Sequence, residues 1–246
     1  MKLPKIFKPQ KNYSLSRFGR NYDGGYLVSN KSILDAKSLI SFGVLDDTSF
    51  EVDFLKLNKV PIFCFDHTLT RNYWKKRIFN DIGASIFNLN LKFLINTFER
   101  YLESRKFFKL NNVKLFNQTI TYNSIRKILK YEILKPIFFK IDIEGSEYRI
   151  LDELIESQDL IVGLVIEFHN VDLQLEKIID FINKFNLQLT HIHPNNYGEV
   201  DKFNNPTVIE FTFEKNPIEG TSDLFLPNRL DQPNNPDKHD LELFFN

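Results

Sequence analysis

The sequence predicts a single α/β domain built on a doubly wound, mostly parallel β-sheet, and two patterns predict it. Short apolar runs that end in Gly or Asp recur along the chain, as expected for strands buried on both faces. Segments with helical spacing separate several of these runs, and alternating strands and helices are typical of a doubly wound sheet. A chain of 246 residues, 42% of them hydrophobic, is long enough to bury one large core.

The strands are predicted from the apolar runs themselves. The run "SLISFG" ends at Gly43 and the run "VPIFCFD" ends at Asp66, so each closes with a residue suited to a strand end. No helical pattern separates the last two runs, which predicts an antiparallel hairpin at the end of the sheet. In chain order, the predicted strands are residues 38–43, 60–66, 83–89, 136–142, 160–169, 187–193 and 207–213.

Three segments between the strands have the spacing of amphipathic helices. Residues 49–56 follow a cluster of Asp, Thr and Ser that favours a helix N-cap. Residues 148–157 and 173–185 repeat apolar side chains every three or four positions. Residues 216–246 are rich in Pro, Asn and Asp without lasting periodicity, so we expect a loop-rich C-terminal extension that lies over the domain.

The charge balance and the cysteine content narrow the class of protein. The chain has 32 Lys or Arg and 32 Asp or Glu, which disfavours a general nucleic-acid binder. The single cysteine, Cys64, excludes an internal disulfide framework and fits a reducing compartment. The N-terminal residues contain no apolar run long enough for a signal peptide or a membrane span. We therefore expect a cytoplasmic protein without a membrane span.

The ends of the predicted strands indicate where a ligand would bind. In an open parallel sheet, ligands bind outside the carboxyl ends of the strands, near the change in strand order. Four predicted strands end at Gly43, Asp66, Asp142 and Glu167–His169, and these ends would face one crevice. An acid at the second end is the usual contact to a ribose. No G-x-G-x-x-G pattern surrounds Gly43, so a nucleoside ligand is favoured over a dinucleotide.

Six motifs occur in order between residues 17 and 198. They are "R-x-G-x-x-x-D-G-G-Y" (17–26), "SFGVLDDTSFE" (41–51), "CFDHT" (64–68), "FKIDIEGSEYRIL" (139–151), "VIEFH" (165–169) and "HIHPNNYG" (191–198). This set resembles the FkbM-type S-adenosylmethionine-dependent methyltransferases and covers most of the chain. The resemblance implies a class I (Rossmann-like) methyltransferase fold as one domain over residues 1–246. It also implies O-methylation of a sugar hydroxyl, on a nucleotide-linked sugar or a precursor of a surface or capsular polysaccharide.

The resemblance also implies a site for S-adenosylmethionine. Asp66 would accept hydrogen bonds from the ribose hydroxyls, His67 would flank the adenosine, and Asp142 would point to the sulfonium or the acceptor. The N-terminal segment, residues 1–36, would close over the cofactor. The implied cofactor contacts are Asp23, Gly24, Ser41, Phe42, Gly43, Asp66, His67 and Asp142.

Asp142, Glu167 and His169 are the predicted catalytic residues. The acceptor hydroxyl must lose a proton, and an imidazole with a near-neutral pKa suits the role of general base. The same three side chains also suit a divalent metal ion such as Mg²⁺, Mn²⁺ or Fe²⁺, which would lower the pKa of a bound hydroxyl. The sequence leaves both routes to an activated hydroxyl open.

Further polar residues are predicted to contact a small-molecule or glycan acceptor. Glu144, His193, Asn195 and Asn196 suit a ligand rich in hydroxyl groups. An ordinary polar hairpin explains the last three equally well. Glu147 is predicted instead to lie at the solvated start of a helix, where an acid favours the helix dipole.

Two other functions fit the same sequence. One is an NAD-dependent oxidoreductase on a similar sheet, against which the missing glycine pattern counts. The other is a non-catalytic, methyltransferase-like binding protein that has kept the fold. A homodimer is also open, because the C-terminal extension would either cover the acceptor pocket or contact a second copy.

Overall fold

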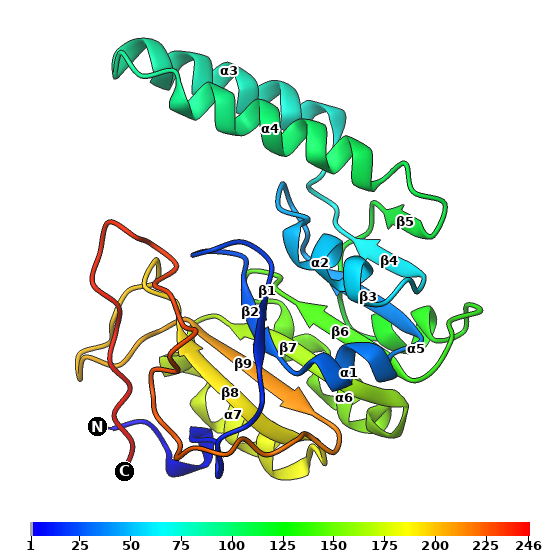
Figure 1. The fold of residues 1–246 in the computed structure, drawn as a ribbon, viewed down its shortest axis with the longest axis vertical. Helices are drawn as coiled ribbons and strands as arrows, with labels where there is room; N and C mark the ends of the chain where they lie inside the picture. Colours follow the sequence, from blue (N-terminus) through cyan, green and yellow to red (C-terminus); the bar gives the residue numbers. More distant parts are fainter. Residues whose placement is uncertain (1) are drawn as a thin grey trace.

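The computed structural model describes residues 2–246, and its centre is a seven-stranded sheet with the order β5-β4-β3-β6-β7-β9-β8 (Figure 1). Met1, the first residue of the predicted domain, lies outside the described residues. The strands are β3 (Ser38–Phe42), β4 (Ile62–Phe65), β5 (Val113–Phe116), β6 (Ile137–Ile141), β7 (Ile161–Phe168), β8 (Gln188–Pro194) and β9 (Ile209–Glu214).

The sheet has the doubly wound, mostly parallel arrangement that the sequence predicts. From β3 the chain runs to β4 and β5 on one side, and it then returns to β6 and β7 on the other side, all in parallel pairs. The last strand, β9, inserts between β7 and β8 and is antiparallel to both. The predicted antiparallel C-terminal hairpin is therefore confirmed, and the change in strand order falls between β3 and β6.

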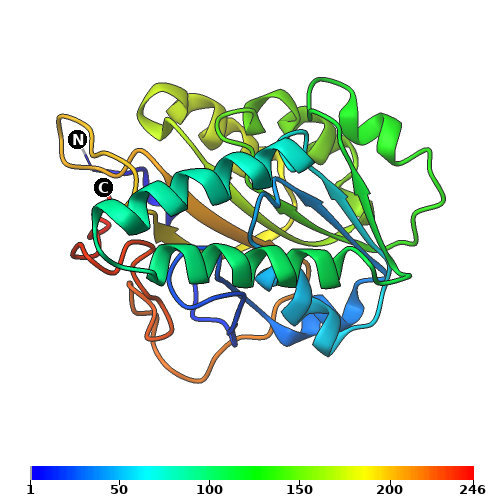
Figure 2. The ribbon, with the colours of Figure 1, turned by 90° about the horizontal axis from the view of Figure 1, so that it is seen from above.

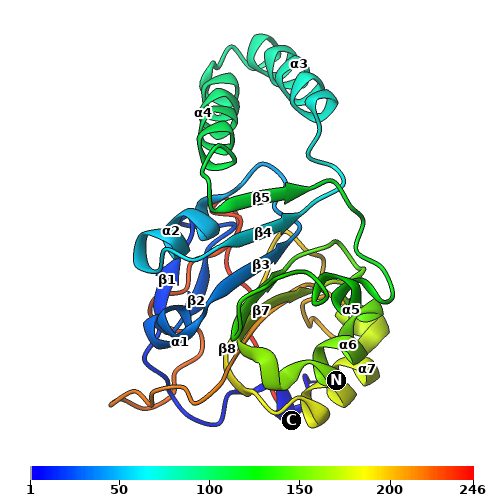
Figure 3. The ribbon, with the colours of Figure 1, turned by 90° about the vertical axis from the view of Figure 1, so that its right-hand side faces the viewer.

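Helices cover both faces of the sheet, as Figure 3 shows. The helices α1 (Asn30–Asp35) and α2 (Ser49–Leu57) pack on one face, where Phe50 and Phe54 contact Phe138 of β6. The opposite face carries α5 (Ser124–Ile128), α6 (Leu151–Glu156) and α7 (Val171–Lys184). There Phe181 packs against Phe168 and Phe213. Because both faces are covered, the central strands are mostly apolar.

One predicted strand is wrong. Residues 83–89 do not form a strand, because residues 83–87 are the last part of a 17-residue helix, α3 (Arg71–Phe87). This helix forms a hairpin with α4 (Lys92–Phe107), and the pair stands clear of the sheet near β5 (Figures 1 and 3). The third strand of the sheet is instead β5, which the sequence did not predict.

The two ends of the chain meet on the outside of the domain. The N-terminal part contains a short 3-10 helix, η1 (Lys5–Phe7), and a two-stranded ribbon of β1 (Ser16–Phe18) and β2 (Tyr26–Val28). Single β-bridges join Leu3 to Phe245 and Tyr13 to Glu219. Two more 3-10 helices, η2 (Glu147–Arg149) and η3 (Gln158–Leu160), flank α6.

Among the described residues, no helix combines the length and apolar character needed to cross a membrane.

Candidate functional site

A cavity of about 670 Å³ opens at the carboxyl ends of β3, β4, β6 and β7. Its volume lies within the range of small-molecule sites, about 300–1,000 Å³. Its position is the crevice that open α/β sheets use for ligands. The predicted site residues that line it are Asp23, Gly24, Gly43, Asp66, His67, Asp142, Glu144, Glu167, His169 and Asn195.

The ends of β3 and β6 are fixed to each other at the floor of this cavity. Asp142 donates its amide to the carbonyl of Phe42 at 3.0 Å, and Gly43 donates its amide to the carbonyl of Phe65 at 3.1 Å. Gly43 has φ +74°, and a Cβ added there would lie 1.5 Å from the carbonyl oxygen of Asp142. Only glycine fits this crossing, so the loop after β3 can pass close to the end of β6.

Two of the implied cofactor contacts, Ser41 and Phe42, do not line the cavity. The Ser41 hydroxyl points to the face of the sheet that α2 covers, where it donates to Glu51 Oε1 at 2.5 Å. The Phe42 ring is fully buried against Phe65 and Phe139. Successive side chains of a strand point to opposite faces, so neither side chain points out of the end of the sheet. The part of this turn that lines the cavity is Gly43.

Asp66, which directly follows β4, is held in its ionised form. Its Oδ1 accepts hydrogen bonds from the amide and the hydroxyl of Thr68 at 2.7 and 2.6 Å, and its Oδ2 accepts from the amide of Leu45 at 2.7 Å. Burial would raise the pKa of Asp66, but these hydrogen bonds lower it below its usual value. Helix capping does not explain the residue, because the N-cap of α3 is Thr70. Oδ2 keeps a lone pair for a ligand in the cavity.

His169, at the end of β7, is oriented by a buried carboxylate. Its Nδ1 lies 3.1 Å from Oε1 of Glu147, whose side chain is fully buried. The other ring nitrogen, Nε2, faces Glu144 and Glu167, with a carboxylate oxygen of each at 3.4 Å. Burial would lower the pKa of His169, but Glu147, Asp142 and Glu144 raise it.

The buried position of Glu147 corrects the sequence prediction of a solvated helix start. The same Oε1 also accepts the amides of Ile143 and Gly145 at 3.1 Å each, so it holds the turn after β6 in place. This turn is tight, with φ +53° at Glu144 and φ +91° at Gly145. Glu147 therefore links the turn after β6 to the imidazole after β7, which spacing along the sequence does not show.

Carboxylates crowd the wall of the cavity beside His169. Burial raises the pKa of Asp142 to about 6, with Lys140 and His169 opposing the rise. Burial, together with the charges of Asp142 and nearby acids, raises the pKa of Glu167 well above its usual value. Burial and mutual repulsion therefore destabilise the ionised forms of these groups, and a further cation in the cavity would stabilise them.

A compact set of possible metal ligands differs from the predicted set by one residue. Asp142, Glu144 and His169 each offer a ligand atom, and these atoms lie within 4.8 Å of one another. The predicted third ligand, Glu167, is 3.4 Å from His169 Nε2 but is also bound by Asn195, whose Nδ2 donates to Glu167 Oε1 at 3.1 Å. An imidazole whose other nitrogen is fixed by a carboxylate is the usual arrangement of a metal-binding histidine.

Lys140 is a site residue that the sequence analysis did not assign. It is buried on β6, lines the cavity, and donates from Nζ to the carbonyl of Gly43 at 3.0 Å. Burial would lower the pKa of Lys140, but Glu51 and Asp142 raise it, so the ammonium stays charged. The one available signal was its position two residues before Asp142 on an otherwise apolar strand.

The predicted acceptor contacts separate into two groups. Glu144 and Asn195 line the cavity. His193 does not, because it is buried between Glu210 and Asp240, with Nε2 3.1 Å from Asp240 Oδ2. Asn196 is also turned away, since its Nδ2 donates to the carbonyl of Asn235 at 3.0 Å. His193 and Asn196 thus contact the C-terminal extension, and neither lines the cavity in which their predicted acceptor would bind.

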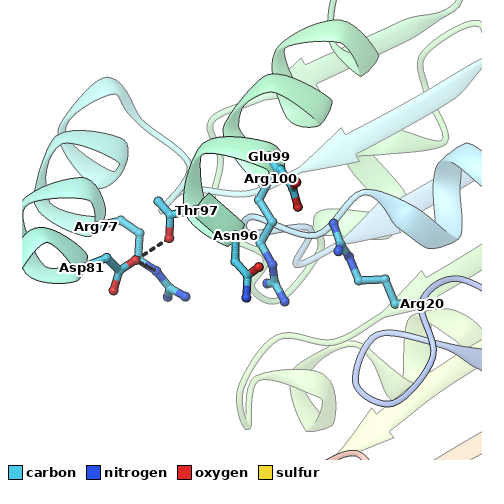
Figure 4. Close-up of a pocket in the computed structure, with 7 residues that line it drawn as sticks. All are labelled: Arg20, Arg77, Asp81, Asn96, Thr97, Glu99 and Arg100. Atoms are coloured by element: carbon cyan, nitrogen blue, oxygen red, sulfur yellow. Dashed lines mark hydrogen bonds and ion pairs between the residues drawn. The ribbon is translucent and has the colours of Figure 1, made fainter. Parts of the chain in front are cut away.

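A second, smaller cavity of about 210 Å³ lies beside the first, between the α3–α4 hairpin and the N-terminal segment (Figure 4). Arg20, Arg77 and Arg100 line it, and Arg100 also lines the large cavity. Acids accompany these arginines: Arg100 Nη1 lies 3.2 Å from Asp46 Oδ1, and Arg20 Nε lies 3.0 Å from Asp47 Oδ2. The rim between the two cavities is therefore polar, with both signs of charge.

No protein-family model matches the chain, and no curated protein matches it either. Solved structures with a related shape include an rRNA methylase from Streptococcus thermophilus, which is 10% identical over 76% of this chain and 93% of that chain, with a TM-score of 0.40. TrmK from M. capricolum, in complex with S-adenosyl-homocysteine, is 13% identical over 79% of this chain and 69% of that chain, also with a TM-score of 0.40. An O-methyltransferase family protein from Burkholderia thailandensis is 10% identical over 75% of this chain and 52% of that chain, with a TM-score of 0.38. Such distant similarity assigns no activity, which has to be inferred from the cavity itself.

Proposed function

We propose that the protein is an S-adenosylmethionine-dependent O-methyltransferase of the FkbM type that acts on a sugar hydroxyl. One observation carries the proposal: an ionised acid at the end of β4 and a histidine among carboxylates at the ends of β6 and β7 face one cavity of about 670 Å³. The acid suits the ribose of a nucleoside cofactor, and the histidine suits a hydroxyl acceptor that must lose a proton, so the reaction needs both groups in one cavity.

The cofactor half of the proposal rests on the β3 and β4 ends. Asp66 Oδ2 would accept a hydrogen bond from a ribose hydroxyl, and Gly43 leaves the backbone open to the ligand. Asp23 and Gly24, from the loop between β1 and β2, line the same cavity and would close over the cofactor. The raised pKa values of Asp142 and Glu167 fit a cationic ligand, because a sulfonium would offset the repulsion between these acids.

In the proposed reaction, His169 is the general base. Bound at the β3 and β4 ends, S-adenosylmethionine would supply an electrophilic methyl group, and its transfer to the acceptor oxygen would release S-adenosylhomocysteine. Nε2 of His169 takes the hydroxyl proton, and Glu147 stabilises the resulting imidazolium through Nδ1. A rigid, largely buried site would supply the remaining acceleration through alignment and preorganised charges.

A metal-assisted form of the reaction is a second proposal, favoured by the compact set of Asp142, Glu144 and His169. Two carboxylates and an imidazole suit Mg²⁺ or Mn²⁺, and Fe²⁺ is also compatible with them. Bound there, such an ion would lower the pKa of a coordinated sugar hydroxyl. His169 would then act as a ligand instead of a base, so the two forms of the reaction are exclusive and can be told apart.

We propose a sugar acceptor, free or nucleotide-linked, because the open side of the cavity is polar. Asn195, Glu144 and Tyr197 line it, and Arg100 connects it to the smaller cavity with its three arginines. Amide, carboxylate and phenol groups suit hydroxyl groups, and the arginines suit a phosphate. An NAD-dependent oxidoreductase and a non-catalytic binding protein remain the competing functions.

Calorimetric titration with S-adenosylmethionine, S-adenosylhomocysteine and NAD, before and after EDTA treatment, tests the cofactor. We expect micromolar binding of the first two ligands and none of NAD. Asp66→Ala should weaken binding by about 10- to 100-fold, the range for one hydrogen bond to a charged group. The surface variant Asp35→Ala is the control. Binding of NAD alone would overturn the proposal in favour of an oxidoreductase.

Methyl transfer to nucleotide sugars, free sugars and RNA then tests the acceptor and the metal. A labelled methyl group on a sugar hydroxyl supports the proposal. A labelled methyl group on RNA alone would show that the acceptor is RNA and not a sugar. Activity that EDTA removes and Mg²⁺ or Mn²⁺ restores assigns the metal-assisted form. Activity unchanged by EDTA assigns His169 as the base. Cofactor binding with no transfer to any acceptor would favour the non-catalytic protein.

A further inference from the structure

The α3–α4 hairpin exposes a row of large apolar side chains on each helix. The exposed fractions of these side chains lie between 40% and 76%. Both helices project from the domain (Figures 1 and 3), and they run side by side when seen from above (Figure 2). We call these residues the apolar seam: Phe79, Ile82, Ile86, Leu91, Ile95, Phe98 and Leu102.

The two helices touch each other through a different set of residues. The rings of Trp74 and Tyr101 are 5.2 Å apart, and the Thr97 hydroxyl donates to Asp81. Ser85, four positions after Asp81 on α3, is also buried, with only 3% of its surface exposed. These contacts fix the antiparallel register of the hairpin.

The seam lies on one side of the hairpin. Along α3, Ile82 and Ile86 each follow a contact residue by one position, as Phe98 and Leu102 do along α4. In a helix, the next residue is rotated by about 100° about the axis. In two antiparallel helices, the residues that directly follow the contact residues therefore point to the same side of the hairpin.

The register then pairs the seam residues across the hairpin. It places Phe79 beside Phe98 and Ile82 beside Ile95, and nearer the tip it places Ile86 beside Leu91. The two rows therefore form one continuous apolar surface, two helices wide.

We propose that a second copy of this chain covers the apolar seam, so that two hairpins form a four-helix bundle. The seam residues are spaced by four, three and four positions from Leu91, the N-cap of α4, to Leu102, and by three and four positions along α3. This is the spacing with which helices pack side chains between one another. Lys75, four positions before Phe79, is a charged residue at the base of the hairpin, where this row ends.

The size of the surface also suits a dimer. The 17-residue α3 is about 25 Å long, and two packed helices are about 20 Å wide, so two copies would bury roughly 1,000 Å² in total. This reaches the lower bound for a specific interface, about 1,000 Å². Exposed apolar patches of several hundred Å² on one subunit commonly mark such contacts.

A dimer through the seam leaves the ligand site accessible. Arg77, Asn96 and Arg100 lie on a polar side of the hairpin, together with Arg20 of the N-terminal segment (Figure 4). Arg100 also lines the large cavity. The hairpin therefore has a polar side toward the domain and an apolar side for the partner.

Light scattering during size-exclusion chromatography, from about 5 to 50 µM protein, is the first test; these concentrations allow for a micromolar interface. We expect a dimer for the wild type and a monomer for the double variant Ile82→Glu/Ile95→Glu. Both positions are exposed, so the monomer should keep its fold by circular dichroism. The control is Leu173→Glu on α7, where a side chain 74% exposed lies outside the seam and the dimer should persist. A monomeric wild type overturns the proposal, and so does a double variant that stays dimeric.

Cross-linking and lipid binding complete the test. Because Cys64 is buried, a cysteine introduced at Ile95 or Phe98 would be the accessible thiol. A short bismaleimide should join two copies through these positions, whereas Leu173→Cys should stay uncoupled. Residues 71–107 carry eight Lys or Arg against three Asp or Glu, so anionic vesicles are the competing occupant. Vesicle binding by the wild type that the double variant loses, without cross-linking, would assign the seam to lipid and overturn the dimer.

Discussion

At the scale of single residues, the site depends on contacts between strand ends that are far apart in the sequence. Glu147 follows β6 and His169 follows β7. One carboxylate oxygen of Glu147 nevertheless contacts the His169 imidazole and accepts two backbone amides of the turn after β6. The sequence predicts acids at the strand ends, because each of these acids directly follows an apolar run. It does not show which acid turns inward, because that depends on the turn at Glu144 and Gly145.

We predict that His169 and Glu147 contribute to turnover and not to cofactor affinity. His169→Ala should lower kcat by about 10²- to 10⁴-fold, the usual contribution of a general base. Glu147→Gln should lower kcat less, because the amide oxygen can still accept the Nδ1 proton while the negative charge is lost. Steady-state kinetics measure both effects, and the affinity for S-adenosylhomocysteine should change by less than about 3-fold if neither residue binds the cofactor.

Glu156→Gln is the matched control for Glu147→Gln. Glu156 pairs with Arg126 on the surface, so its variant should keep the wild-type kcat. A loss of cofactor affinity equal to the loss of kcat in the Glu147 variant would contradict the positioning role. It would show instead that the whole turn after β6 had collapsed.

At the scale of elements, the buried strands were predictable and the projecting hairpin was not. The strands β3, β4, β6 and β7 are apolar because both faces are covered, so their sequences alone mark them. Residues 83–89 are also apolar, but their apolar side chains belong to the seam and the tip of a helical hairpin. β5 is a strand without a continuous apolar run, because it is short, lies at the edge of the sheet and is only partly buried. Its sequence therefore did not predict it.

Two glycines in different elements should respond oppositely to alanine. Gly43→Ala should lower the free energy of unfolding by more than about 2 kcal/mol, since φ +74° is strained and the Cβ would overlap the Asp142 carbonyl. Gly83→Ala should raise it by about 0.5–1 kcal/mol, because a Cβ there meets nothing within 4 Å and alanine favours a helix interior. Urea unfolding monitored by circular dichroism measures both. Equal effects at the two positions would contradict the close crossing of β3 and β6.

At the scale of the whole molecule, a buried polar network joins the C-terminal extension to the sheet. His193 on β8 lies between Glu210 of β9 and Asp240 of the extension, with Nδ1 3.5 Å from Glu210 Oε2. Nearby, Asn234 donates to Glu210 at 2.7 Å, and His191 Nε2 lies 2.9 Å from Asp231 Oδ1. The composition of residues 216–246 predicted loops, but only the folded sheet shows which side chains hold them.

This network should make attachment of the extension depend on pH. Burial would lower the pKa of His193, but its hydrogen bonds to Asp240 and Glu210 and the charges of Glu210 and Asp231 raise it to about 10, from 6.5 in a free side chain. A group with a higher pKa in the folded state binds its proton more tightly there, so protonation stabilises the folded form. The contribution is complete below pH 6.5 and is lost as the pH rises toward 10.

We therefore expect the extension to detach in alkaline solution before the sheet unfolds. Hydrogen exchange of residues 228–241, measured from pH 6.5 to 10.5 and corrected for the intrinsic rise with pH, should show protection falling across this window. His193→Gln should show low protection at every pH, because a neutral amide keeps one hydrogen bond but cannot carry the charge between two carboxylates. His239→Gln is the control, since His239 is exposed in the same segment and its variant should behave as the wild type. Protection that stays constant through pH 10 in the wild type would show that apolar contacts, such as those of Leu226 and Leu243 with the core, hold the extension without the charged network.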